Sequence, residues 1–245
     1  MPIPAHPRCR CAIIPVIDET KNNYDIKEDE KRQSEIRARR EAYFNRRKAK
    51  DTVVFDTMSK KDIESWSKSH IKTNIDYSGA SVDVARITAK TIKEIEDSGI
   101  SLDDTKIVFG GTKGHYGGYN PTTKTIHLGT RISNTTEEDI RSLRKLGKKR
   151  FSVEGYRGTV LHEVGHAIDA ISSEELSKTI GRSSNLYEKA VSISSYAGTK
   201  SAYGMSRASE ATAENLAAYL DKENINSVSP EIKEIFDKYF KKKKK

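Results

Sequence analysis

The residues His162-Glu163-Val164-Gly165-His166 follow the pattern H-E-x-x-H, and the rest of the chain can be interpreted from them. Two histidines four positions apart project from one face of a helix, so their imidazoles can bind one metal ion. The glutamate between them points toward the same site, where a carboxylate can act as general base on a metal-bound water. The motif therefore predicts a helix built around a metal centre.

We expect the helix that holds this motif to run from about Gly158 to Ile171. Its other sides are apolar, with Val160, Leu161, Val164, Ala167, Ile168 and Ile171 available for burial. Burial of the polar ligands costs desolvation unless the metal and neighbouring groups satisfy the imidazoles. Asp169 lies three residues after His166, close to the same face. Its carboxylate can either accept the second N–H of a ligand histidine or face water as an ordinary helix acid.

A catalytic zinc site needs three protein ligands and one open position for water. No histidine follows His166, and the position where a metzincin places its third histidine is Ser172. The third ligand is therefore expected to be acidic and to come from a later helix. Glu210 and Glu214 share one face of an alanine-rich helix that runs through Leu220, and either can be the ligand on chemistry alone. The alanines would let this helix approach another closely.

These two stretches together resemble a known family. His162-Glu163-Val164-Gly165-His166-Ala167-Ile168-Asp169, followed by Tyr203 and Glu210-Ala211-Thr212-Ala213-Glu214, is similar to the catalytic domain of anthrax lethal factor and its relatives, including the Pro-Pro endopeptidases. The resemblance spans roughly residues 158 to 220. It implies a zinc metallopeptidase of the gluzincin type that binds one Zn²⁺.

The resemblance also implies a role for each matching residue. His162, His166 and Glu210 would be the zinc ligands, and Glu163 the general base. Tyr203 would hydrogen-bond the oxyanion, with Tyr196 as a rival whose spacing fits less well. Glu214 would lie behind the ligands and hold them in place by hydrogen bonds, and Asp169 is a second candidate for this supporting role.

The sequence before the motif predicts an α+β fold. Helices are expected from Phe55 to His70 and from 81 to 98, then a strand from Thr105 to Phe109. A glycine-rich segment, 110–119, is expected to be a loop near a cleft, because it lacks the spacing of a phosphate-binding loop. Asn120-Pro121 predicts a turn, and a hydroxyl cap followed by acids predicts another helix at Thr136. A last helix is expected to begin at Ser229-Pro230 and to pack through Ile232, Ile235, Phe236 and Tyr239.

The alternating strand at 124–128 is the candidate for binding extended substrate, because H-E-x-x-H peptidases hold peptides against an antiparallel edge strand above the active helix. Thr125, Ile126 and His127 are its central residues, and His127 is expected to be a strand surface residue rather than a ligand. The predicted architecture is therefore zincin-like. A small mixed sheet with an antiparallel edge strand would lie over the active-site helix, and the C-terminal half would be helical.

The chain is expected to hold two regions, a charged extension over 1–50 and a peptidase domain over 51–245, with its core at 105–220 and a lysine tail at 241–245. Residues 1–17 contain His6-Pro7-Arg8-Cys9-Arg10-Cys11, which resembles the H-P-x-C-R-C segment near the end of MuF-type phage head morphogenesis domains. That resemblance implies a phage context and no activity. The net charge is +9, but the basic runs are expected to be solvated faces, so nucleic acid is not the expected partner.

The expected function is therefore zinc-dependent hydrolysis of peptide bonds in a protein or peptide substrate, by a phage-borne or secreted toxin or effector. A phage head or secretion particle would be its carrier. The alternative is a phage structural protein with a non-catalytic zinc site that binds DNA. The N-terminus has no signal-peptide pattern and no apolar run is long enough to span a membrane, so a virion-associated or injected protein is expected, cytoplasmic when first made.

Overall fold

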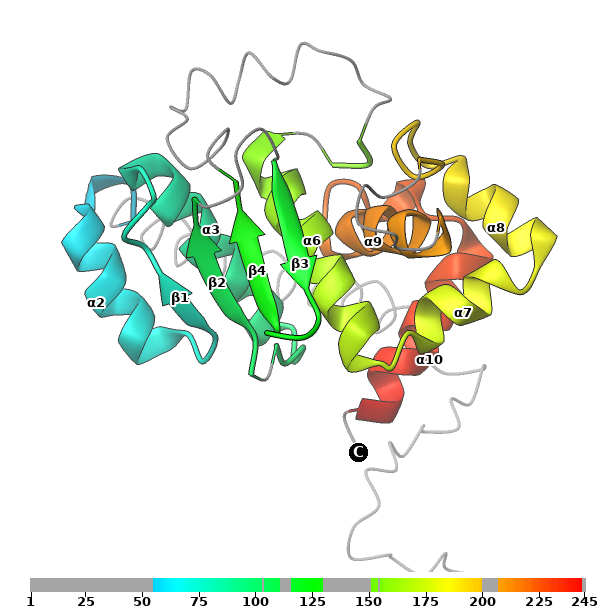
Figure 1. Ribbon diagram of the computed structural model, residues 1–245, viewed down its shortest axis with the longest axis horizontal. Coiled ribbons are helices and arrows are strands. Elements are labelled where there is room, and N and C mark those ends of the chain that lie inside the picture. Colours follow the sequence, from blue (N-terminus) through cyan, green and yellow to red (C-terminus); the bar gives the residue numbers. More distant parts are fainter. Residues whose placement is uncertain are drawn as a thin grey trace, which may run out of the picture. The chain divides into compact units, whose positions relative to one another are not determined.

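A mixed four-stranded sheet forms one side of the domain (Figure 1). The computed structural model describes residues 55–102, 104–110, 116–129, 151–153, 155–199 and 207–243. The MuF-like segment, the domain boundary near residue 50, the helix expected at Thr136 and the side chain of Tyr203 lie outside these ranges. The strands are β1 (Asn74–Asp76), β2 (Lys106–Phe109), β3 (Gly117–Asn120) and β4 (Thr125–Leu128), in the order β1-β2-β4-β3. Pairs β1–β2 and β2–β4 are parallel, and β3–β4 is antiparallel.

The strand order corrects one prediction. β4, which contains Thr125, Ile126 and His127, pairs with β2 on one side and β3 on the other, so it is not an edge strand. The antiparallel edge among the described strands is β3, formed by Gly117 to Asn120 from the segment expected to be a loop. A turn at residues 121–124 joins β3 to β4, as expected, and the Asn120 side chain accepts hydrogen bonds from the amides of Thr122 and Thr123.

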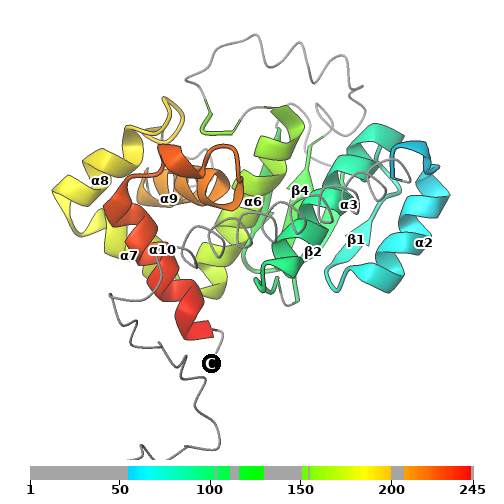
Figure 2. The ribbon, with the colours of Figure 1, turned by 180° about the vertical axis from the view of Figure 1, so that it is seen from behind.

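Two helices come early in the described chain, α2 before strand β1 and α3 between strands β1 and β2. α2 (Lys60–His70) begins later than expected because Ser59 and Asp62 form a reciprocal capping box at its start. α3 (Val82–Asp97) matches its prediction, with Ser81 as the N-cap and Gly99 adopting a positive φ just beyond its end. The predicted apolar stripe of α3 is buried at Val84, Ile92 and Ile95. Together with α6, α3 covers one face of the sheet (Figures 1 and 2).

The motif helix, α6 (Gly155–Ile171), lies between the sheet and a helical C-terminal half (Figure 1). That half contains α7 (Glu175–Gly181), α8 (Ser184–Val191), α9 (Arg207–Leu220), the short 3-10 helix η2 (Ile225–Ser227) and α10 (Pro230–Lys243). The last helix begins at the predicted proline and buries Ile232 and Phe236 completely, so it packs on the domain as expected. The fold is α+β, and no helix in the described part of the chain is long and apolar enough to cross a membrane.

Polar contacts at the start of α6 tie the two halves together. The Arg157 guanidinium reaches Glu94 on α3 at 2.9 Å and Asp221, just after α9, at 3.2 Å. The buried Tyr156 hydroxyl lies 3.1 Å from the Thr88 hydroxyl on α3. Since α6 is buried on nearly all sides, these contacts fix the position of its first turn relative to both halves.

Candidate metal centre

Three side chains from α6 and α9 converge on one point, and all three are buried. The Nε2 atoms of His162 and His166 are 3.1 Å apart. Glu210 places Oε2 at 3.3 Å from the first nitrogen and at 3.5 Å from the second. A tetrahedral ion with bonds of 2.0–2.2 Å needs donor atoms separated by roughly 3.3–3.6 Å. Two of the three separations lie in this range and the third is slightly shorter, so the triangle has about the size of a single metal site. Glu210, and not Glu214, is the acid that lies beside both Nε2 atoms.

The Glu210 carboxylate also shows an unmet bonding capacity. Its Oε2 is buried and has no hydrogen-bond partner, although it lies 3.3 and 3.5 Å from the two imidazole nitrogens. A buried carboxylate oxygen without a donor is costly. Although burial opposes its charge, the two histidines lower the pKa of Glu210 below its ordinary value. An anionic oxygen facing two imidazole nitrogens is what a cation would satisfy.

Glu214 supports the ligand His162 from behind, as the resemblance implied. Its Oε1 lies 2.8 Å from His162 Nδ1, on the other side of the ring from Glu210. If Nδ1 carries the proton and donates it to this carboxylate, Nε2 keeps a lone pair for the metal. Ser194 Oγ and the Ser152 amide donate to Glu214 Oε2 at 2.7 and 2.6 Å. Despite its burial, these donors and His162 lower the pKa of Glu214, so it stays ionised.

Asp169 has a different partner from the one the sequence suggested. Its Oδ1 accepts a hydrogen bond of 3.0 Å from the amide of Ser177 in α7. The second nitrogen of His166 instead lies 3.3 Å from the Ser209 hydroxyl on α9. Asp169 therefore satisfies a backbone amide near the start of α7, and Ser209 takes the position beside the ligand. Ser152, Ser194 and Ser209 were not predicted, because none of them belongs to a motif and only the folded chain places them beside Glu214 and His166.

Glu163 lies on α6 between the two histidines and is buried beneath the edge strand β3. Burial raises the pKa of its carboxyl above the ordinary value, while the charges of His162 and His166 act in the opposite direction. A carboxyl whose pKa moves toward neutrality is better suited to exchange protons near pH 7. Its carboxylate is therefore a buried titratable group on the same helix as the two clustered histidines.

Two helix backbones meet directly beside the ligands. A Cβ on Gly165 would lie 2.9 Å from both Cα and O of Ala213 on α9, closer than real side chains approach. The small residues predicted on α9 therefore do permit close packing, and the missing side chain at Gly165 completes it. This contact sets the distance over which Glu210 reaches His162 and His166.

Two further residues predicted for the site, His127 and Tyr196, lie outside the ligand cluster. His127 is half-buried in β4, pairs with Gly118 and Val108, and is not one of the clustered ligands. Tyr196 packs edge-on against His162, with ring centroids 5.5 Å apart.

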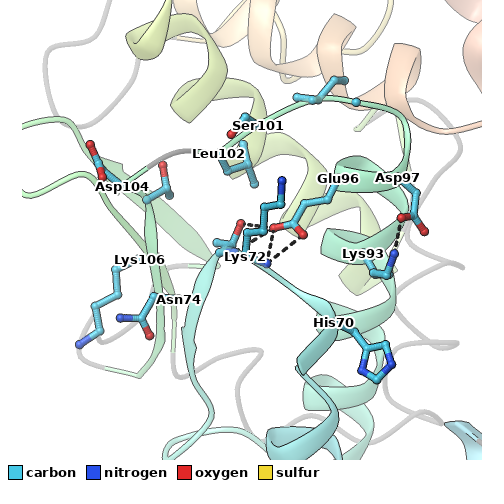
Figure 3. Close-up of a pocket in the computed structure, with 14 residues that line it drawn as sticks. His70, Lys72, Asn74, Lys93, Glu96, Asp97, Ser101, Leu102, Asp104 and Lys106 are labelled. Atoms are coloured by element: carbon cyan, nitrogen blue, oxygen red, sulfur yellow. Dashed lines mark hydrogen bonds and ion pairs between the residues drawn. The ribbon is translucent and has the colours of Figure 1, made fainter. Parts of the chain in front are cut away.

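A cavity of about 650 Å³ lies at the amino ends of β1 and β2, near the end of α3 (Figure 3). Its charged groups are largely occupied, because Glu96 accepts the amides of Lys72 and Thr73 and Lys93 pairs with Asp97. None of the clustered ligands lines it. Glu163, which lies between the two clustered histidines on α6, instead lies against Gly117, and Gly117 pairs with Leu128 at the carboxyl end of β4.

A scan against protein-family models finds no match for this chain, and no curated protein matches it either. The chemistry of the site therefore has to be inferred from its own residues.

Replacement of Glu214 with Gln is expected to weaken Zn²⁺ binding about 10- to 100-fold, because a neutral amide is a poorer acceptor for the His162 N–H. Competition with a chromophoric chelator measures the affinity. Glu223→Gln, a matched change at an exposed carboxylate, should leave it unchanged. Equal affinity in the Glu214 variant would contradict a supporting role for this residue.

Gly165→Ala is expected to force α6 and α9 apart and to cost about 1–3 kcal/mol of stability. The same separation should weaken Zn²⁺ binding, because Glu210 moves with α9. Urea unfolding of the metal-free protein and the chelator competition measure the two effects. A variant as stable as wild type with undiminished zinc affinity would show that the close contact is not needed.

Proposed function

We propose that this chain is a zinc-dependent endopeptidase with a zincin-like fold, similar to the lethal factor and Pro-Pro endopeptidase group. The observation that supports this most strongly is the buried triangle of His162, His166 and Glu210, with Glu163 beside it. Two imidazoles and one carboxylate with room for a fourth ligand are the donor set of a hydrolytic zinc site. Zinc bound there would lower the pKa of a bound water and polarise a substrate carbonyl.

Glu163 would carry the proton in this reaction. Its carboxylate accepts a proton from the attacking water and returns it to the leaving amine, so one residue serves first as base and then as acid. The imidazole of His162 stays oriented throughout because Glu214 holds its Nδ1. Burial raises the pKa of the Glu163 carboxyl above its ordinary value, which makes its carboxylate a stronger base toward the attacking water.

β3 is the strand on which an extended substrate would lie, in place of β4. It is the outer strand of the described sheet, runs antiparallel to β4, and passes directly over Glu163 at Gly117. An extended peptide paired with this edge by main-chain hydrogen bonds would run past the general base. The mode of binding predicted from the sequence therefore still applies, on the neighbouring strand.

The biological setting proposed is a toxin or effector carried by a phage-type particle or secreted. The proposed setting rests only on the segment 6–11, which resembles the MuF segment.

Glu163→Gln is expected to retain zinc and to lose turnover by about 10²- to 10⁴-fold, because the amide cannot accept the proton of the attacking water. Purified wild type and variant would be tested on a diverse peptide library, with the zinc content of each measured. Glu175→Gln, at an exposed position in α7, is the matched control and should cleave normally. Zinc in wild type without cleavage of any peptide would favour a structural metal site.

Tyr203→Phe is expected to lower kcat by about 10²- to 10³-fold with zinc retained, because one hydrogen-bond donor to the oxyanion is lost. Tyr196→Phe should have a much smaller effect, since the spacing of Tyr196 from the motif fits the family pattern less well. The kinetics of both variants on the best library peptide decide between them. A large loss in the Tyr196 variant alone would transfer the oxyanion role to that residue.

A further inference from the structure

The first residue of the edge strand, Gly117, lies directly on the side chain of Glu163. A Cβ added to Gly117 would be 2.6 Å from Oε1 of Glu163 and 2.9 Å from both its Cδ and its Cγ. Real Cβ atoms do not approach heavy atoms this closely. The strand backbone therefore fits over the carboxylate only because residue 117 has no side chain.

Backbone conformation does not explain this glycine. The described glycines with a left-handed φ are Gly99, Gly110 and Gly155, and Gly117 is not among them. Any residue could adopt the strand conformation at this position, so the requirement is for space. The neighbouring Gly118 differs, because a Cβ there would meet no atom within 4 Å.

The nature of the obstructing atoms determines what a side chain at 117 would disturb. At Gly165 the obstruction is the backbone of Ala213, so two helices would have to separate. At Gly117 it is the outer part of a glutamate side chain, which can rotate while the backbone stays in place. A methyl group at 117 would therefore displace the Glu163 carboxylate and leave His162, His166 and Glu210 where they are.

We propose that Gly117 is a positioning residue that holds the Glu163 carboxylate in place, by letting the backbone of β3 close over it. This inference rests on the proposed function, because it assigns Gly117 a role through the general base. Contact with the strand restricts the rotamers of Glu163 and keeps its carboxylate beside the ligand cluster. The edge strand would thus both bind substrate and orient the base.

The test measures binding of acetohydroxamate to the cobalt(II)-loaded protein by titration of its visible spectrum, so that no peptide substrate is needed. A hydroxamate bound to the metal would also donate a hydrogen bond to a carboxylate held at the general-base position. Gly117→Ala should bind acetohydroxamate at least about tenfold more weakly than wild type, as expected for loss of a hydrogen bond to a charged group. Gly118→Ala, the same substitution one residue along, should stay within about twofold. Metal content should be equal in all three proteins.

A second pair of proteins shows whether the effect passes through Glu163. In a Glu163→Ala background the obstructed side chain is gone, so adding Gly117→Ala should change the hydroxamate affinity by less than about twofold. Undiminished affinity in the Gly117 single variant, or an equal further loss in the Glu163→Ala background, would overturn the role of Gly117. Absence of metal from wild type would overturn the proposed function and this role with it. Metal and hydroxamate binding with the expected pattern, but no cleavage of any peptide, would overturn the proposed function alone.

Discussion

The close contact between α6 and α9 is the constraint on which the site depends. Because Gly165 has no side chain, the backbone of Ala213 lies against it, at the level of the motif. Glu210 and Glu214, one helical turn apart on α9, then reach the two nitrogens of the His162 ring from opposite sides. A wider separation between the helices would remove a ligand and its support together.

The close packing of α6 and α9 also brings three glutamate side chains together in the interior of the domain. Glu163, Glu210 and Glu214 are each at most 6% exposed, and so is the second ligand histidine, His166. Buried carboxylates are tolerated only when donors or cations satisfy them. Glu214 is satisfied by Ser152, Ser194 and His162, whereas Oε2 of Glu210 has no hydrogen-bond donor. The charge left unbalanced therefore lies at the point where the two Nε2 atoms also converge, which is the arrangement that a divalent cation completes.

Helical spacing accounts for most of what the sequence predicted correctly. Residues four apart on α6 and on α9 had to share a face, which placed His162 with His166 and Glu210 with Glu214. Helical spacing also predicted the apolar stripes through which α3 and α10 pack. A high content of β-forming residues identified β2, and alternation of side chains identified β4. Neither signal contains information on strand order, so β4 was wrongly placed at the edge. β3 was missed because Gly117-Gly118-Tyr119-Asn120 has little intrinsic preference for strand.

Two glycines let other elements pack closely against α6, and each contact affects a different residue of the site. Gly165 lets α9 approach, which fixes the third ligand relative to the two histidines. Gly117 lets β3 approach, which confines Glu163 between the strand and its own helix. One obstruction is backbone and the other is a side chain, so the first contact fixes the position of Glu210 and the second fixes only where the Glu163 carboxylate lies. In the proposed peptidase, metal binding and proton transfer would therefore depend on separate contacts, although their residues are adjacent in the sequence.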